Sequence, residues 1–171
     1  MRVQAIFNRD GGTFRTTDME AFARHAEKVF AEAGHHLDCD IVEGADIEMA
    51  LTRCAERTDL DAMLAGGGGK IVNVGAGAGQ KGVAQMGAYS ASKSAVIRIT
   101  EAMAGELREQ NINVNCVLPS IIDTPPNRAA MPDADPKKWV APSDLAAVIT
   151  FLCSEQARAV HGVALPVVGL S

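Results

Sequence analysis

The chain has 171 residues, of which 47% are hydrophobic, 22% charged and 4% aromatic, and its formal net charge is −5. This size and composition are typical of one compact domain, residues 1–171, with an aliphatic core. The acidic balance gives no support to nucleic acid or an anionic membrane as partner, and no apolar stretch approaches the ~20 residues that span a bilayer.

Two further features favour a cytoplasmic protein. The N-terminus alternates apolar and polar residues and lacks the apolar core of a signal peptide. The four cysteines are scattered and form no CxxC pair, so we expect small buried hydrophobes in a reducing compartment; they are Cys39, Cys54, Cys116 and Cys153.

The N-terminal part of the chain alternates strand and helix patterns. Residues 3–7 form an apolar run of strand length. Thr17–Glu20 is a capping box, and apolar residues then recur at helical spacing as far as Ala33. We expect a second strand at 37–42, at a sheet edge because it carries two aspartates, and a second helix at 47–55.

Residues 60–65 are ambiguous. They form an apolar run, but only the four glycines 66–69 separate them from the stronger strand pattern at 71–74. Adjacent parallel strands need a crossover of a dozen or more residues, so both runs cannot be neighbours of that kind. We favour a short helical or irregular segment at 59–65, with an antiparallel strand or hairpin as the alternative.

The remaining elements follow in regular order. A long helix is expected at 88–108 and a buried strand at 112–118. Residues 119–142 hold six of the seven prolines and are expected to form a long loop, which is uncommon unless functional or mobile. A fourth helix should begin after Ser143 and end by Gly162, and the last strand is expected at 163–168.

The alternation predicts an α/β fold with three layers: a doubly wound parallel five-stranded sheet, flavodoxin-like or Rossmann-like, in the order 2-1-3-4-5. In such a sheet ligands bind at the carboxyl ends of strands where the order reverses. The loops after strands 1 and 3 flank that crevice. Their backbone N–H groups could hold a phosphate, although tight turns are the simpler explanation; these residues are Asn8, Gly11, Gly12, Thr13 and 75–79.

Tyr89 and Lys93 form the strongest candidate for chemistry. They lie four residues apart at the start of the helix expected at 88–108, so their side chains share one face. A nearby ammonium favours phenolate, and we expect it to lower the tyrosine pKa from its ordinary value near ~10. Such a pair could pass a proton to or from an alcohol or ketone oxygen.

Around this pair, residues 66–171 resemble the C-terminal half of the short-chain dehydrogenase/reductase family. The motifs in order are a glycine turn, the strand 70–74, a Gly-rich loop, the Tyr89 helix and a strand ending at Pro119. The resemblance implies NAD or NADP as cofactor, with Tyr89 as acid–base residue and Lys93 lowering its pKa and holding the ribose. It also implies cofactor contacts at Gly75, Pro119 and Thr124, the last through its hydroxyl to the nicotinamide.

The departures from that family are equally informative. The family's catalytic serine lies thirteen residues before the tyrosine, where this chain has Ala76. Its Pro-Gly after the strand is Pro119-Ser120 here, and the TGxxxGxG turn that carries the pyrophosphate is absent. The helix that supplies a catalytic asparagine is absent too. With these departures we expect the pair to be vestigial.

Residues 1–69 resemble the nucleotide-binding N-terminal lobe of the diacylglycerol kinase family. Asn8 to Thr13 is close to that family's Asn-Pro-x-Ser-Gly turn, and 60–69 resembles its strand ending in Gly-Gly-Asp-Gly-Thr. Gly68 replaces the acidic residue and Lys70 the threonine, and the second lobe is missing. The two resemblances together predict a chimera, natural or engineered, of a kinase-like fragment 1–69 and a dehydrogenase-like fragment 70–171.

Three functions follow, of which we favour the first. The first is a folded chimera with no complete active site, no catalysis and no cofactor. The second is a vestigial NAD(P)-dependent oxidoreductase that acts on an alcohol or ketone. The third is a kinase. In the dehydrogenase family the tyrosine helix often packs against a second subunit. The resemblance therefore implies a homodimer as one possible state of this chain.

Three other residue types have plain structural interpretations. We expect no metal site, because His35 and His36 have no metal-binding partners at useful spacing. Lys70 follows four glycines but lacks the phosphate-loop pattern, so we expect a solvated side chain. Trp139 is expected to anchor the proline-rich loop.

Overall fold

The computed structural model describes residues 2–8, 24, 27–28, 31–32, 36–42 and 58–170. Residues 24, 27–28 and 31–32 are helical, in agreement with the helix predicted to extend to Ala33. The capping box Thr17–Glu20 and the helix predicted at 47–55 lie outside the described residues.

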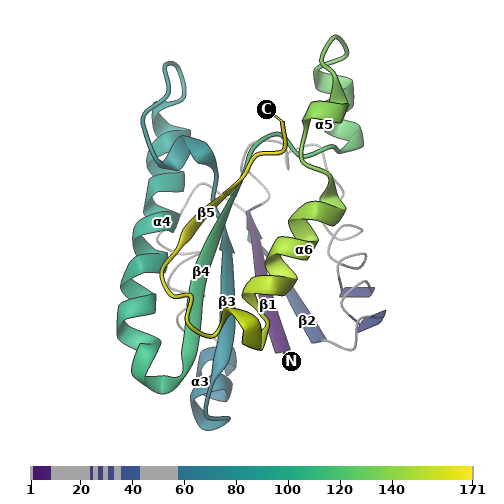
Figure 1. Ribbon diagram of the computed structural model, residues 1–171. Helices are drawn as coiled ribbons and strands as arrows, with labels where there is room; N and C mark the ends of the chain where they lie inside the picture. Colours follow the sequence, from purple (N-terminus) through teal and green to yellow (C-terminus); the bar gives the residue numbers. More distant parts are fainter. Residues whose placement is uncertain are drawn as a thin grey trace.

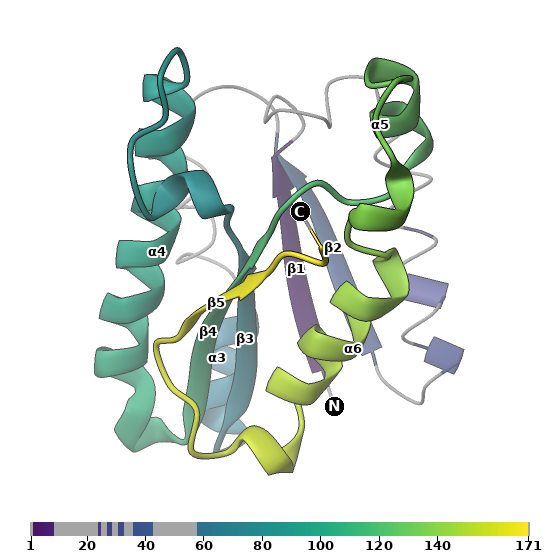
Figure 2. The ribbon, with the colours of Figure 1, turned by 45° about the horizontal axis from the view of Figure 1, so that its top comes forward.

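All five predicted strands are present. They are β1 (Arg2–Asn8), β2 (His36–Val42), β3 (Gly69–Val74), β4 (Ile112–Pro119) and β5 (Ala164–Val167). The pairing is parallel throughout, with β1 on β2 and with β3, β4 and β5 in that order. In both views β1 lies beside β3 (Figures 1 and 2). The described ladders do not join those two strands, so one five-stranded sheet in the order 2-1-3-4-5 stays a prediction.

Strand β4 organises the packing. All eight of its residues are buried, and its side chains alternate between two apolar layers. Ile112 and Val114 contact Met63 and Ala104, whereas Val117 contacts Leu152. The first layer contains α4 (Gly87–Leu107) and α3 (Thr58–Ala65), and the second contains α6 (Pro142–Leu152). Helices α4 and α6 therefore cover opposite faces of the sheet (Figure 2).

The glycine run ends α3 and starts β3. Gly68 N donates to Met63 O at 2.9 Å and Gly67 N donates to Leu64 O at 3.2 Å, the pair of bonds that defines a Schellman cap. Gly67 has a φ of +78°, which an L side chain rarely adopts. The favoured helical segment at 59–65 is thus confirmed, whereas the kinase resemblance implied a strand there. A helix cap accounts for these glycines.

The proline-rich segment contains more structure than the sequence indicated. It holds α5 (Pro125–Ala130), the short 3-10 helix η4 (Pro136–Lys138) and a parallel bridge between Ile122 and Val140. Trp139 is buried, as its predicted anchoring role requires. The interpretation of 119–142 as one long loop is wrong because Thr124 and Asp135 each cap a turn whose first residue is a proline.

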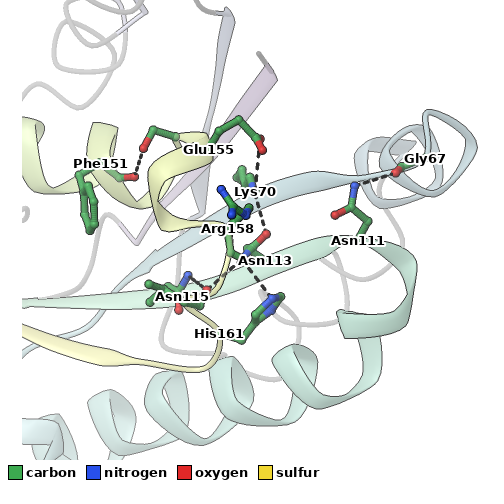
Figure 3. Close-up of polar contacts among 11 residues, drawn as sticks. Gly67, Lys70, Asn111, Asn113, Asn115, Phe151, Glu155, Arg158 and His161 are labelled. Atoms are coloured by element: carbon green, nitrogen blue, oxygen red, sulfur yellow. Dashed lines mark hydrogen bonds and ion pairs between the residues drawn. The ribbon is translucent and has the colours of Figure 1, made fainter.

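Lys70 is buried, which contradicts the predicted solvated side chain. Its Nζ donates to Asn113 Oδ1 at 2.7 Å and lies 3.8 Å from Glu155 Oε1 (Figure 3). Asn113 Nδ2 in turn contacts the carbonyls of Arg158 and Val160 at 3.0 and 2.9 Å. The glycine run does not expose Lys70 because β3 directs its side chain toward the α6 face, where Asn113 supplies an acceptor.

His161 completes this cluster. Asn113 Nδ2 lies 3.2 Å from His161 Nε2, and His161 Nδ1 is a buried atom without a partner among the described residues. Because Lys70 uses the oxygen of the Asn113 amide, the amide nitrogen faces the carbonyls of Arg158 and Val160, which take its two protons, and also lies next to the His161 ring. Asn115 Nδ2 also donates to Val160 O at 2.9 Å, and the two asparagines together hold residues 158–163 against β4.

Replacing Asn113 should test how much the chain depends on this buried cluster. Asn113→Ala removes the strongest partner of a buried ammonium, so we expect the free energy of unfolding to fall by about 2–3 kcal/mol. The measurement is urea denaturation followed by circular dichroism. Glu155→Gln is the matched control: its carboxylate lies 3.8 Å from Lys70 Nζ but is exposed to solvent, so the change should stay within about 0.5 kcal/mol. Equal effects of the two substitutions would contradict this account of Lys70.

A second prediction concerns the approach of α4 to the loop after β3. A Cβ at Gly79 would lie 2.7 Å from the backbone C and O of Lys93, whereas a Cβ at Gly77 would meet nothing within 4 Å. Gly79→Ala should therefore reduce the free energy of unfolding by about 1–3 kcal/mol, and Gly77→Ala should leave it nearly unchanged. Urea midpoints of the two variants give the comparison, and a stable Gly79→Ala protein would show that α4 can move without cost.

Candidate active site

The carboxyl ends of β3, β4 and β5 meet at one edge of the sheet. Gly75 N donates to Val117 O at 2.9 Å and Ser120 N donates to Val167 O at 3.0 Å, which extends the strand pairing into the loops. The loop after β3, the start of α4, α5 and the end of the described chain gather at this edge, at the top of Figure 1. The predicted site residues on β3, β4 and α4 all belong to these segments.

Tyr89 and Lys93 occupy the first turns of α4. The Nζ of Lys93 lies over the Tyr89 ring, 5.8 Å from its centroid, within the range of a cation–π contact. Both side chains are half-buried. The helix therefore brings the phenol and the ammonium together on one face, as the four-residue spacing predicts.

The expected direction of the tyrosine pKa is wrong. Burial raises the pKa of Tyr89 above its ordinary value of 10.0. Burial also lowers the pKa of Lys93, an effect opposed by the neighbouring Cys116 thiol. Desolvation outweighs the ammonium because a half-buried phenol loses more hydration as phenolate than a charge stacked on its ring can return. Burial therefore disfavours the phenolate relative to a solvent-exposed tyrosine.

Ala76 follows β3, where the resemblance implies a serine. The residue is 8% exposed, in extended conformation, and precedes the 3-10 helix η2 (Gly77–Gly79). The hydroxyls of the three serines nearest Tyr89 in the chain are all engaged. Ser92 Oγ donates to Tyr89 O at 2.8 Å and Ser94 Oγ donates to Gly79 O at 2.6 Å, while Ser90 Oγ accepts from Val83 N at 3.3 Å. Each has a structural partner of its own.

The three C-terminal cofactor candidates have structural roles here. Gly75 is buried, and a Cβ there would lie 2.7 Å from Leu118 Cδ2, so glycine is needed for packing. Pro119 is the buried last residue of β4. Thr124 caps α5 by accepting the Asn127 N–H at 3.4 Å, and its hydroxyl proton has no acceptor among the described residues. Thr124 therefore fits a contact to a cofactor amide, whereas Gly75 offers backbone alone.

Of the four N-terminal candidates for cofactor binding, the structure describes only one. Asn8 is the last residue of β1, and Gly11, Gly12 and Thr13 lie outside the described residues.

The part of the chain that the structure describes contains no cluster of three His, Cys, Asp or Glu side chains able to hold a metal ion. Within the same residues, no helix has the length and apolar character that a membrane crossing requires.

A sheet of parallel strands with helices on both faces and a Tyr–Lys pair near its carboxyl edge is the arrangement that the resemblance to the short-chain dehydrogenase/reductase family implies. Residues 49–135 match the short chain dehydrogenase family. That match covers half of the chain, and the chain belongs to this family.

Curated relatives agree. The chain is 30% identical over 134 residues to dehydrogenase/reductase SDR family member 4 of Bos taurus, covering 72% of this chain and 48% of that protein. It is 34% identical over 116 residues to 2-dehydro-3-deoxy-D-gluconate 5-dehydrogenase of Escherichia coli K12, covering 61% and 45%. The chain thus spans about half the length of the curated relatives it matches.

Solved structures share the fold. One is described as a 2-deoxy-D-gluconate 3-dehydrogenase of Agrobacterium tumefaciens with bound NADP; its TM-score is 0.70 at 20% identity, covering 98% of this chain and 94% of that one. Another is described as an NAD(P) dependent gluconate 5-dehydrogenase of Beutenbergia cavernae with NADP bound at low occupancy; its TM-score is 0.65 at 22% identity, covering 98% of this chain and 95% of that one.

These matches bear on the predicted chimera. The family match begins at residue 49, inside the fragment 1–69 that we interpreted as kinase-like, and before the predicted junction near 66–70. The matches give no support to a diacylglycerol kinase segment or to a chimera. The Schellman cap at Gly67 shows that the glycine run 66–69 ends a helix, whereas the kinase resemblance needed it to follow a strand.

The ionisation of Tyr89 can be measured directly because it is the only tyrosine in the chain. We expect the phenolate absorbance to titrate with a midpoint above 10.0 in the folded protein. Lys93→Met should leave the midpoint nearly unchanged, because burial is the cause of the raised pKa of Tyr89 and also lowers the pKa of the Lys93 ammonium. Circular dichroism at each pH confirms that the protein remains folded, and a wild-type midpoint below that of free tyrosine would refute the dominance of burial.

Proposed function

We propose that the chain reduces a ketone to an alcohol with NAD(P)H, with Tyr89 as proton donor. The observation that supports this most directly is the Lys93 ammonium 5.8 Å from the Tyr89 ring at the start of α4, beside the carboxyl edge of a family-typical sheet. The nicotinamide would supply the hydride to the carbonyl carbon. The Tyr89 hydroxyl would give its proton to the carbonyl oxygen as negative charge develops there.

Burial of Tyr89 disfavours the phenolate that would take a proton from an alcohol. A phenol that stays protonated at neutral pH is ready to donate a proton to a ketone, but it is a poor base toward an alcohol. The neighbouring Lys93 stabilises the phenolate left after donation, because its positive charge lies over the ring. Thr124 is the residue suited to hold the nicotinamide amide, since its hydroxyl proton has no acceptor among the described residues.

Ala76 limits the rate in this proposal. A serine at this position would hold the substrate oxygen by a hydrogen bond, and an alanine methyl group cannot. Loss of one such donor typically costs 10²–10³ in rate. Ser92 and Ser94 donate their hydroxyl protons to backbone carbonyls, so neither of them replaces it in the described arrangement, and Ser90 Oγ accepts from Val83 N.

The same observation favours a second candidate, a non-catalytic member of the family. With a methyl group at the buried position 76 in place of a hydroxyl, the chain could be folded and inactive. The two candidates differ in cofactor binding and in the response to a restored hydroxyl.

The test is Ala76→Ser, assayed by loss of NADH or NADPH absorbance with small aliphatic and cyclic ketones. We expect kcat to rise about 100-fold over the unmodified chain. Adding Tyr89→Phe in the Ala76→Ser background should abolish the gain, since that variant keeps the ring and loses the proton. The reduction rate should fall as the pH rises through the Tyr89 pKa, because only the protonated phenol donates.

Cofactor titrations separate the candidates. Micromolar binding of NADPH or NADH by the unmodified chain, followed by nucleotide fluorescence, supports the oxidoreductase. Absence of binding together with an inactive Ala76→Ser variant would establish the non-catalytic alternative.

A further inference from the structure

Helix α4 is fixed to the loop after β3 by two serines that lie next to the Tyr89–Lys93 pair. Ser94 Oγ donates to Gly79 O at 2.6 Å, and Val83 N donates to Ser90 Oγ at 3.3 Å. Ser90 and Ser94 are themselves four residues apart, so they form a second pair one position further along the helix. One pair carries the candidate chemistry, and the other binds the loop.

The contact at Gly79 is close. A Cβ on Gly79 would lie 2.7 Å from the backbone C and O of Lys93 and 3.0 Å from Ile97 Cδ1. The loop backbone therefore abuts the helical turn that bears Lys93. Any increase in the separation of loop and helix must also break the short Ser94 hydrogen bond.

The loop connects this contact to position 76. Gly79 N donates to Ala76 O at 2.9 Å, and both residues are buried. A continuous chain of short contacts thus runs from position 76 through Gly79 to Ser94 and the backbone of Lys93. Position 76 is where the substrate oxygen would be held, and α4 carries the proton donor.

We propose that Ser94, with Ser90, is a positioning residue that fixes the Tyr89–Lys93 pair relative to position 76. This inference rests on the proposed function for its catalytic consequence, but its structural content does not. Ser94 touches neither substrate nor cofactor in this scheme. It acts by holding Gly79, and hence the loop, against the turn that carries Lys93.

The same helix supplies a matched control. Asn73 Nδ2 donates to Thr100 Oγ1 at 2.9 Å, and Thr100 Oγ1 donates to Val96 O at 2.8 Å. This contact also ties α4 to the sheet through a buried hydroxyl, but it lies about two turns beyond Lys93. Thr100→Val should destabilise the fold without changing the start of the helix.

The first experiment measures Tyr89 ionisation in Ser94→Ala and in Thr100→Val by phenolate absorbance. In Ser94→Ala the start of α4 is no longer held against the loop, so Tyr89 should become more exposed and the midpoint should fall toward that of free tyrosine. In Thr100→Val the midpoint should match the wild type, although thermal denaturation shows a lower stability. Equal shifts in the two variants, or no shift in either, would overturn the proposal.

The second experiment places each substitution in the Ala76→Ser background. Ser94→Ala should lower kcat about 10- to 100-fold with the KM for NADPH unchanged, because a displacement of about 1 Å at the reacting groups has effects of that size. Ser94→Thr keeps the hydroxyl and should restore most of the rate, and Thr100→Val should leave kcat near that of its parent. A uniform loss across all three variants contradicts the positioning role.

The two experiments distinguish a failure of the proposed function from a failure of the positioning role. If Ala76→Ser shows no turnover, the proposed function is wrong, and the absorbance titration alone decides whether Ser94 positions Tyr89. If turnover is present but insensitive to Ser94→Ala, the proposed function stands and the positioning role is wrong.

Discussion

The complete burial of β4 is the constraint on which the rest of the structure depends. A strand whose eight residues are all buried needs an apolar layer on each face, and its alternating side chains supply one half of both layers. Helix α4 must therefore lie close to one face and α6 to the other. The position of Tyr89 and Lys93 at the carboxyl edge follows from this packing, because α4 begins where the loop after β3 returns to the sheet.

The two asparagines on β4 are the exception to this apolar pattern, and their environment explains how the strand tolerates them. Asn113 and Asn115 face the layer of α6 and satisfy their amides with carbonyls of the segment before β5 and, in the case of Asn113, with Lys70 (Figure 3). Buried polar groups of this kind are acceptable only when nearly every member has a partner. Here they fix the return of the chain to β5 at the amino edge, opposite the candidate site.

Local patterns in the sequence were sufficient for most of the fold and insufficient for the electrostatics of the site. The five strands and α4 follow from apolar periodicity, and the helical choice at 59–65 followed from the short connection to β3. Lys70 could not be placed, because its burial depends on an asparagine 43 residues away. The helical turns within 119–142 were not predicted, because prolines were interpreted as helix breakers, whereas Pro125 and Pro136 are the first residues of such turns. The spacing of Tyr89 and Lys93 identified neighbours correctly, but the direction of the tyrosine pKa depends on burial, which spacing does not reveal.

The candidate site illustrates how packing limits chemistry. The close approach of Gly79 to Lys93 and the engagement of Ser90 and Ser94 hold α4 against the loop, so the backbone around position 76 is rigid and buried. Rigidity of this kind benefits catalysis only when the group at the fixed position can bind the reacting oxygen. In this chain that group is a methyl, and burial raises the pKa of the Tyr89 phenol on the helix that is held against the loop. The packing thus fixes the loop and the start of α4 to each other, while the alanine at position 76 leaves no hydroxyl at the end of the strand.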